Sequence, residues 1–246
     1  MTSRRLLVRV RRARGGQSRG TGRLCAAGLL AQAGLLGKLA RTSGLGVAGG
    51  LVGGISGLAV NVAVARGLRD GSPGAADVVT LARATVACAV AGLVTDAAWG
   101  RAESPALVPL AAAALVLDAV DGAVARRTRS ASEFGARFDG EVDALLILAL
   151  SAHAARPYGW WVLTGGLARY LFAAAGWAWP WMGRGLPPRY WRKVATAAEG
   201  IVLVVAAARV LPRPATRVGL AGGLSLIGES FGRDVLWLWH RRDLPV

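Results

Sequence analysis

Long apolar blocks that alternate with short connectors constrain the fold of this chain most strongly. Of its 246 residues, 54% are hydrophobic and only 18% are charged, whereas about a quarter of the residues of a soluble domain are charged. The apolar residues gather in blocks close to the ~20 residues that cross a bilayer, rather than in amphipathic stripes. This pattern is typical of a helical membrane protein with several spans.

Six apolar segments follow one another in the last two thirds of the chain. They predict membrane-spanning helices at Val79–Ala97, Leu107–Ala125, Val142–Ala155, Gly159–Trp179, Val194–Leu211 and Val218–Trp239. Short connectors with several prolines separate them, as expected between neighbouring helices. We therefore predict an all-α integral membrane protein with a six-helix bundle over 77–240.

The residues before this bundle divide into a basic and an apolar part. The arginine-rich stretch 1–23 predicts a disordered tail, and 24–66 predicts one or two N-terminal apolar helices, at Leu24–Ala40 and Gly44–Ala65. Glycines recur every four residues in the second of these, in two rows: Gly46, Gly50 and Gly54, and Gly49, Gly53 and Gly57. Such rows let helices approach closely in lipid. A phosphate-binding glycine loop is disfavoured, because no strand precedes the glycines and no Gly-Lys-Ser/Thr follows them.

The net charge of +16, from 30 basic and 14 acidic residues, indicates where the connectors lie. The basic residues collect between the apolar blocks, where they are typical of cytoplasmic loops, and no nucleic-acid-binding motif accompanies them. We therefore expect the bilayer, and not nucleic acid, as the partner, and the bacterial plasma membrane as the location. A cytoplasmic tail then requires that 24–66 form a hairpin; otherwise one of its two segments lies in the membrane interface.

The stretch DAVDGAVARRTRSASEFGARFDGEVD, from Asp118 to Asp143, contains four of the nine aspartates of the chain. Asp118 and Asp121 share one helix face, and Asp139 and Asp143 share a face of the next, antiparallel helix. Four carboxylates brought together repel one another unless a cation joins them. Oxygen ligands without cysteine or histidine predict Mg²⁺ or Mn²⁺.

These acids also allow three other interpretations: helix caps, a cation transporter or a non-catalytic scaffold. Polar residues can cap helix ends, but four ionisable residues beside apolar spans are costly and favour a function. A cation transporter would place its acids near the middle of the bilayer, whereas these lie toward one end of their spans. A non-catalytic membrane scaffold would most simply have lost one of the acids, and none is missing.

The acids belong to a longer pattern, Asp118-x2-Asp121-Gly122-x2-Ala125-Arg126-x8-Gly135-x3-Asp139-x3-Asp143. It resembles, at every fixed position, the signature of the CDP-alcohol phosphotransferase family. The resemblance implies six transmembrane helices and a transferase of phospholipid biosynthesis. Such an enzyme moves a substituted phosphoryl group from a CDP-alcohol lipid, often CDP-diacylglycerol, to a small alcohol acceptor and releases CMP. It also implies a homodimer. The basic connectors predict that the active site faces the cytoplasm.

The resemblance assigns roles to individual residues. Asp118, Asp121 and Asp139 would bind the metal, with Asp143 beside them as a further ligand and as general base. Gly122 and Ala125 would leave room for the nucleotide. Arg126 would reach a phosphate, and Gly135 would let the loop turn into the next helix.

A second resemblance lies upstream, at Asp77-x2-Thr80-x2-Arg83, where family members often have Asn-x2-Thr-x2-Arg. It implies that Thr80 and Arg83 contact cytidine or phosphate, whereas Asp77 departs from the pattern. An arginine that extends to the membrane interface is an equally acceptable interpretation of Arg83.

The acceptor side has a weaker signal. Lys193-x2-Thr196-x2-Glu199 is similar to Lys-x2-Thr-x2-Gln of some phosphatidylglycerophosphate synthase-like members, with Glu in place of Gln. Polar residues inside the last spans predict a second polar lining that would suit glycerol 3-phosphate or inositol phosphate: Arg169, Lys193, Glu229 and Arg233. Each of these can also be a structural ion-pair partner.

Overall fold

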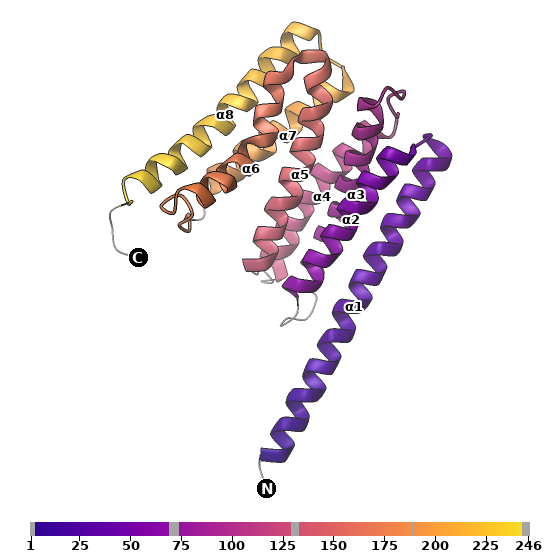
Figure 1. The fold of residues 1–246 in the computed structure, drawn as a ribbon, viewed down its shortest axis with the longest axis vertical. Helices are drawn as coiled ribbons and strands as arrows, with labels where there is room; N and C mark the ends of the chain where they lie inside the picture. The colour runs from indigo at the N-terminus through magenta and orange to yellow at the C-terminus, as the bar shows by residue number, and fades with distance from the viewer. Residues whose placement is uncertain (1–2, 69–73, 129–132, 188, 243–246) are drawn as a thin grey trace. The chain divides into compact units, whose positions relative to one another are not determined.

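The structure is a computed structural model that describes residues 3–68, 74–128, 133–187 and 189–242. Within these ranges it describes all side chains except those of 3–19, 75–76, 121–128 and 133–134. Every regular element in the described ranges is helical, which confirms the all-α prediction. The elements are α1 (Ser3–Thr42), α2 (Val47–Gly67), α3 (Ala75–Ala98), α4 (Leu107–Thr128), α5 (Glu133–Tyr158), the short 3-10 helix η1 (Trp160–Val162), α6 (Leu163–Ala178), α7 (Tyr190–Ala208) and α8 (Arg213–Trp239) (Figure 1).

The chain forms two compact units, residues 1–142 and 143–246, and the division between them falls within α5. The first unit contains α1 to α4 and the beginning of α5. The second contains the rest of α5 and the helices up to α8.

Most of each predicted span is helical, although Gly159–Trp179 covers both η1 and α6, and Val194–Leu211 runs past the end of α7. Only part of the membrane prediction is supported by length and hydropathy. Among the described residues, α2 and the stretch Asp77–Ala98 of α3 are long and apolar enough to cross a bilayer, and Leu107–Val120 of α4 is a shorter apolar helix. Helices α5, α7 and α8 carry ionisable residues inside their apolar runs, which lowers their hydropathy. Six membrane crossings therefore stay a prediction.

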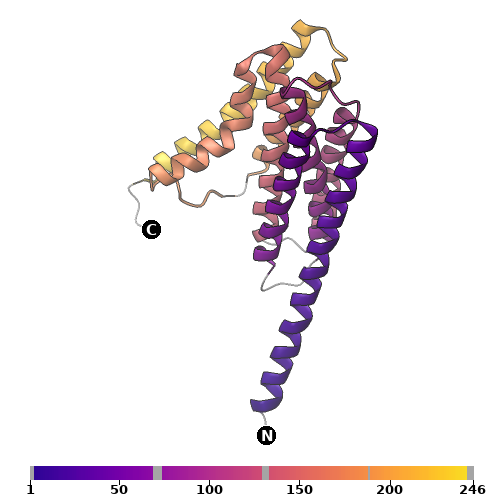
Figure 2. The same ribbon diagram turned by 45° about the vertical axis from the view of Figure 1, so that its right-hand side comes forward.

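Helix α1 begins at Ser3, where the sequence predicts a disordered tail as far as Arg23. Arginine and leucine are good helix formers, and this stretch continues directly into the apolar part of the same helix. Both views show the N-terminal part of α1 extending past the end of α2, while its C-terminal part runs beside α2 (Figures 1 and 2).

Helices α1 and α2 form an antiparallel hairpin joined by the short loop 43–46. Polar side chains of α1 donate hydrogen bonds to backbone carbonyls of α2 and of Leu68, the residue that follows α2. The Thr21 hydroxyl donates to the carbonyl of Leu68 at 3.4 Å, and the Gln32 amide donates to that of Gly53 at 3.2 Å. Because these bonds satisfy groups that lipid cannot, they support the hairpin among the arrangements that the sequence left open.

One of the two predicted glycine rows makes the close helix contacts. A Cβ on Gly49 would lie 2.4 Å from the carbonyl oxygen of Gly92 in α3, and a Cβ on Gly92 would lie 2.5 Å from that of Gly49. Gly53 and Gly57 lie against side chains of α1: a Cβ would be 2.9 Å from Leu36 Cδ2 at position 53 and 2.7 Å from Gln32 Cγ at position 57. Gly50 and Gly54 of the other row have nothing within 4 Å. The buried row thus sets the spacing of α1, α2 and α3.

A carboxylate from α3 closes the N-terminal end of α2. Asp96 is buried, and its two oxygens accept bonds from the backbone N–H groups of Gly46, at 2.5 Å, and Gly49, at 2.8 Å. A carboxylate at this position satisfies free N–H groups and complements the helix dipole. Arg101, just beyond α3, donates to the carbonyl of Gly44 at 2.8 Å, so both ends of the loop 43–46 are tied to α3.

In the second unit, α7 packs against α8, and α8 also contacts α6 and η1. Glycines again allow close packing: a Cβ on Gly166 of α6 would lie 2.8 Å from the Cα of Leu148 in α5. The rings of Phe172 and Phe231 join α6 to α8 with their centroids 5.4 Å apart.

We predict that Gly49→Ala lowers the stability of the protein and that Gly50→Ala does not. The added methyl group at position 49 meets a backbone carbonyl that cannot rotate away, which costs about 1–3 kcal/mol when a packed interface must open. The neighbouring position 50 has open space. Thermal unfolding of both variants in detergent provides the measurement. Equal melting temperatures for the two variants would contradict the close contact between α2 and α3.

Candidate metal and phosphate site

The candidate site is built around a buried arginine of the first unit. Arg83 lies one turn after Thr80 on α3, and only 1% of its surface is exposed. Small buried residues such as Ala84 and Ala87 follow it along the helix, so the arginine is enclosed at its base. A buried guanidinium needs charged partners.

Two aspartates from different helices supply these partners. Arg83 donates through Nη1 to Oδ1 of Asp118 in α4, and through Nη2 to Oδ1 of Asp139 in α5. Its Nη2 also lies 3.4 Å from the backbone carbonyl oxygen of Asp139. The planar fork of one arginine thus joins three helices of the unit. The guanidinium is therefore bound to these two aspartates, and its position relative to the membrane interface stays a prediction.

The two aspartates are only partly buried, with 38% of the Asp118 side chain and 24% of the Asp139 side chain exposed. Asp143 lies one turn beyond Asp139 on the same continuous helix, and it is also half-buried. One carboxylate oxygen from each of Asp118, Asp139 and Asp143 lies within 4.8 Å of the others. These three acids therefore lie close together, as the motif spacing predicts.

The donor set fits a small divalent cation. Three carboxylates beside one arginine leave an excess of negative charge, and charges this close repel strongly when they are shielded from water. Carboxylate oxygens are the ligands that Mg²⁺ and Mn²⁺ prefer. Oxygens around an octahedral ion at 2.0–2.1 Å are about 3–4.2 Å apart, which is compatible with three carboxylate oxygens that all lie within 4.8 Å of one another.

Several predicted residues lie outside the side chains that the structure describes. Asp121, Gly122, Ala125 and Arg126 all fall on the last turns of α4, where only the course of the helix is described. Gly135 lies in the first turn of α5 and is half-buried. Their predicted roles at the metal and the nucleotide stay predictions.

The four predicted acceptor residues all lie in the second unit. Glu229 and Arg233 form an ion pair one turn apart on α8, and the indole nitrogen of Trp191 in α7 donates to Glu229 at 3.0 Å. Both members of the pair are exposed, as is Lys193, whereas Arg169 of α6 is half-buried. The ion pair lies on the surface of α8, and the bond from Trp191 joins it to α7. A common lining of all four residues stays a prediction.

Helix α7 carries a buried acid, Glu199, that is not among the predicted site residues. It is 1% exposed, and a Cβ on Gly165 of α6 or on Gly223 of α8 would lie 2.9 Å or 2.1 Å from its carboxylate oxygens. Its Oε2 has no hydrogen-bond partner among the described residues. The sequence signal for this buried acid is the Glu that stands in place of Gln in the Lys-x2-Thr-x2-Gln pattern. A second missed acid, Asp234 of α8, is buried beside Arg192, with Nε and Oδ2 3.4 Å apart.

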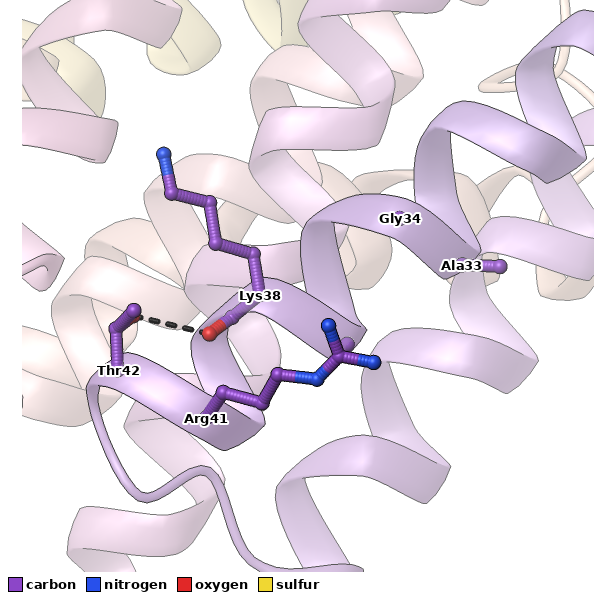
Figure 3. A pocket seen from close by; sticks show the side chains of 6 residues that line it. Ala33, Gly34, Lys38, Arg41 and Thr42 are labelled. Carbon is purple, nitrogen blue, oxygen red and sulfur yellow. Dashed lines mark hydrogen bonds between the residues drawn. The ribbon is translucent and has the colours of Figure 1, made fainter.

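A shallow hollow of about 390 Å³ lies elsewhere in the first unit, on the surface of α1. Figure 3 shows its lining, which comes entirely from one helix: Ala33, Gly34, Gly37, Lys38, Arg41 and Thr42. The Thr42 hydroxyl donates to the carbonyl of Lys38 at 2.9 Å, and both basic side chains are exposed. The hollow contains no carboxylate and is separate from the aspartate cluster.

Apolar helices that bring carboxylates together around a buried arginine define a candidate cation-binding membrane protein. The model of the CDP-alcohol phosphatidyltransferase family matches residues 74–227, more than half of the chain. The chain therefore belongs to this family, whose members are membrane-embedded phosphotransferases. Neither the curated proteins nor the solved structures contain a significant match to the chain. The matched region begins directly before α3, so α1 and α2 precede it.

Proposed function

We propose that this protein transfers a phosphatidyl group from CDP-diacylglycerol to the hydroxyl group of a small alcohol, in a reaction that requires Mg²⁺ or Mn²⁺. Membership of the family supports phosphotransfer from a CDP-alcohol. The donor lipid, the acceptor and the metal are the parts that we add. The observation that supports the metal is the group of three carboxylates, within 4.8 Å of one another, inside the matched region.

The proposed site would hold the cation on Asp118, Asp139 and Asp143, with Asp121 as a fourth acid. The bound ion would offset the negative charge on the diphosphate of the donor. Asp143 accepts the proton of the acceptor hydroxyl. The acceptor oxygen then bonds to the phosphorus that carries diacylglycerol, and the bond from that phosphorus to the CMP oxygen breaks, so that CMP leaves with the electron pair.

The nucleotide would lie along the ends of α3 and α4. Gly122 and Ala125 offer no side chain that would obstruct it, Arg126 is suited to a phosphate, and Gly135 to the turn into α5. Thr80, buried on the same side of α3 as Arg83, is the remaining candidate contact. Since Arg83 already pairs with two aspartates, we assign it to the carboxylates and not to the phosphate.

We propose that residues of the second unit bind an anionic acceptor. Arg169, Lys193 and Arg233 provide positive charge, and Glu229 can accept a hydroxyl hydrogen bond. Glycerol 3-phosphate and inositol phosphate both combine a phosphate with free hydroxyl groups. We further propose that the enzyme acts as a homodimer in a bacterial plasma membrane, with the aspartates toward the cytoplasm.

We predict that the purified protein releases CMP from CDP-diacylglycerol only when an acceptor alcohol and Mg²⁺ or Mn²⁺ are present. Removal of the metal with EDTA abolishes the release, and added Mg²⁺ restores it, because the diphosphate must be neutralised before CMP can leave. The measurement is CMP formation with a panel of alcohols, which also identifies the acceptor. Binding of the cation without any CMP release would instead favour the transporter or the scaffold.

We predict that Asp143→Asn lowers CMP release by at least ~100-fold, the usual effect of removing a general base. An amide keeps the shape of the side chain but cannot take the proton. Binding of a CDP-alcohol, measured separately, falls much less. The matched control is Glu141→Gln, an exposed position two residues earlier on α5, which retains activity. Full turnover of the Asp143 variant excludes it as the base.

We predict that the basic end of α1 and the loop 43–46 lie on opposite sides of the membrane. Ser18 precedes the end of α1 at Thr42 by about 36 Å of helix, which exceeds the ~30 Å hydrocarbon core. In a background without Cys25 and Cys88, a cysteine at Ser18 resists an impermeant thiol reagent in intact cells, whereas a cysteine at Ser43 reacts. Labelling at Ser18 and protection at Ser43 would invert the proposed orientation.

A further inference from the structure

Arg83 donates a hydrogen bond to one carboxylate oxygen of each of two aspartates. Its Nη1 engages Oδ1 of Asp118, and its Nη2 engages Oδ1 of Asp139. Asp118 and Asp139 also belong to the group that can hold a cation. While the arginine keeps these bonds, Oδ1 of each of the two aspartates shares its electron density with the guanidinium, so it is a weaker metal ligand than the second oxygen of the same carboxylate.

The surroundings of Arg83 keep it in this position. It is 1% exposed, and its helix neighbours Ala84, Ala87 and Cys88 are fully buried. Helix α3 is fixed from the other side by the contact of Gly92 with Gly49 and by the bonds of Asp96 to α2. A guanidinium that is buried at its base has no solvent to turn toward, so loss of its carboxylate partners would be costly.

A carboxylate that already accepts a hydrogen bond on one oxygen suits some cations better than others. Mg²⁺ and Mn²⁺ are small, take six ligands and bind carboxylates through single oxygens, with water completing the shell. Ca²⁺ takes six to eight oxygens at longer distances and often binds both oxygens of a carboxylate. An arginine that weakens one oxygen of each of two carboxylates as a ligand therefore disfavours Ca²⁺, which gains from binding both oxygens, more than it disfavours Mg²⁺ or Mn²⁺.

We propose that Arg83 determines the metal specificity of this site by holding Asp118 and Asp139 as single-oxygen ligands, so that Mg²⁺ or Mn²⁺ is selected over Ca²⁺. The inference rests on the proposed metal dependence and adds a residue that sets the choice of ion. Arg83 acts through the two carboxylates and is a positioning residue.

The test is the ratio of affinities in the protein purified in detergent. Free Mn²⁺ is measured by electron paramagnetic resonance, and Ca²⁺ and Mg²⁺ are titrated as competitors against wild type and Arg83→Gln. We expect the affinity for Ca²⁺ relative to Mg²⁺ to rise by about tenfold in the variant, the usual size of an effect on a ligand's hydrogen-bond partner. Loss of the positive charge alone would raise both affinities by the same factor, and general damage would lower both.

Two further variants complete the experiment. Arg83→Lys keeps a cation but lacks the planar fork, so the ratio moves in the same direction by a smaller factor; it also serves if Arg83→Gln does not fold. Arg101→Gln removes an exposed arginine beyond the end of α3 and leaves the ratio unchanged. An unchanged ratio in both Arg83 variants overturns this inference alone. A wild-type protein that binds no Mn²⁺ overturns the proposed metal dependence with it.

Discussion

The ion pairs of one buried arginine hold the described part of this site together. Arg83 of α3 reaches Asp118 of α4 and Asp139 of α5, so a single side chain determines where two carboxylates from separate helices lie. Removing one partner of a buried ion pair costs about 3–5 kcal/mol, and less here because both aspartates are partly exposed. The cluster can therefore remain close together despite its own repulsion.

The helices that precede the family region support the helix that carries this arginine. Gly28 of α1 packs against Leu81 of α3, which lies between Thr80 and Arg83, and a Cβ on Gly28 would lie 2.8 Å from it. Gly49 of α2 meets the backbone of α3 further along. The N-terminal hairpin thus contacts the site helix directly, and we infer that its structural contribution is to fix α3.

Much of the site could be predicted because its information is local. Asp118 and Asp139 belong to a motif with fixed spacing. Helix periodicity places Asp118 and Asp121 on one face of their helix, and Asp139 and Asp143 on one face of the next, and the short connector between the two helices makes them antiparallel neighbours. Arg83 was different, since a snorkelling arginine and a buried one have the same local sequence. The two glycine rows of α2 were equivalent for the same reason: only the position of α3 makes Gly49 close-packed and leaves Gly50 open.

The sequence by itself determined the helical architecture, the family and the acids that converge, because hydropathy and motif spacing depend on residues near one another in the chain. The tertiary structure alone decided that Arg83 pairs with the acids, that Asp96 caps α2, and that Glu199 is buried against Gly165 and Gly223. Each of these contacts joins residues more than 20 positions apart. Their energies depend on burial and distance, which a linear pattern does not contain.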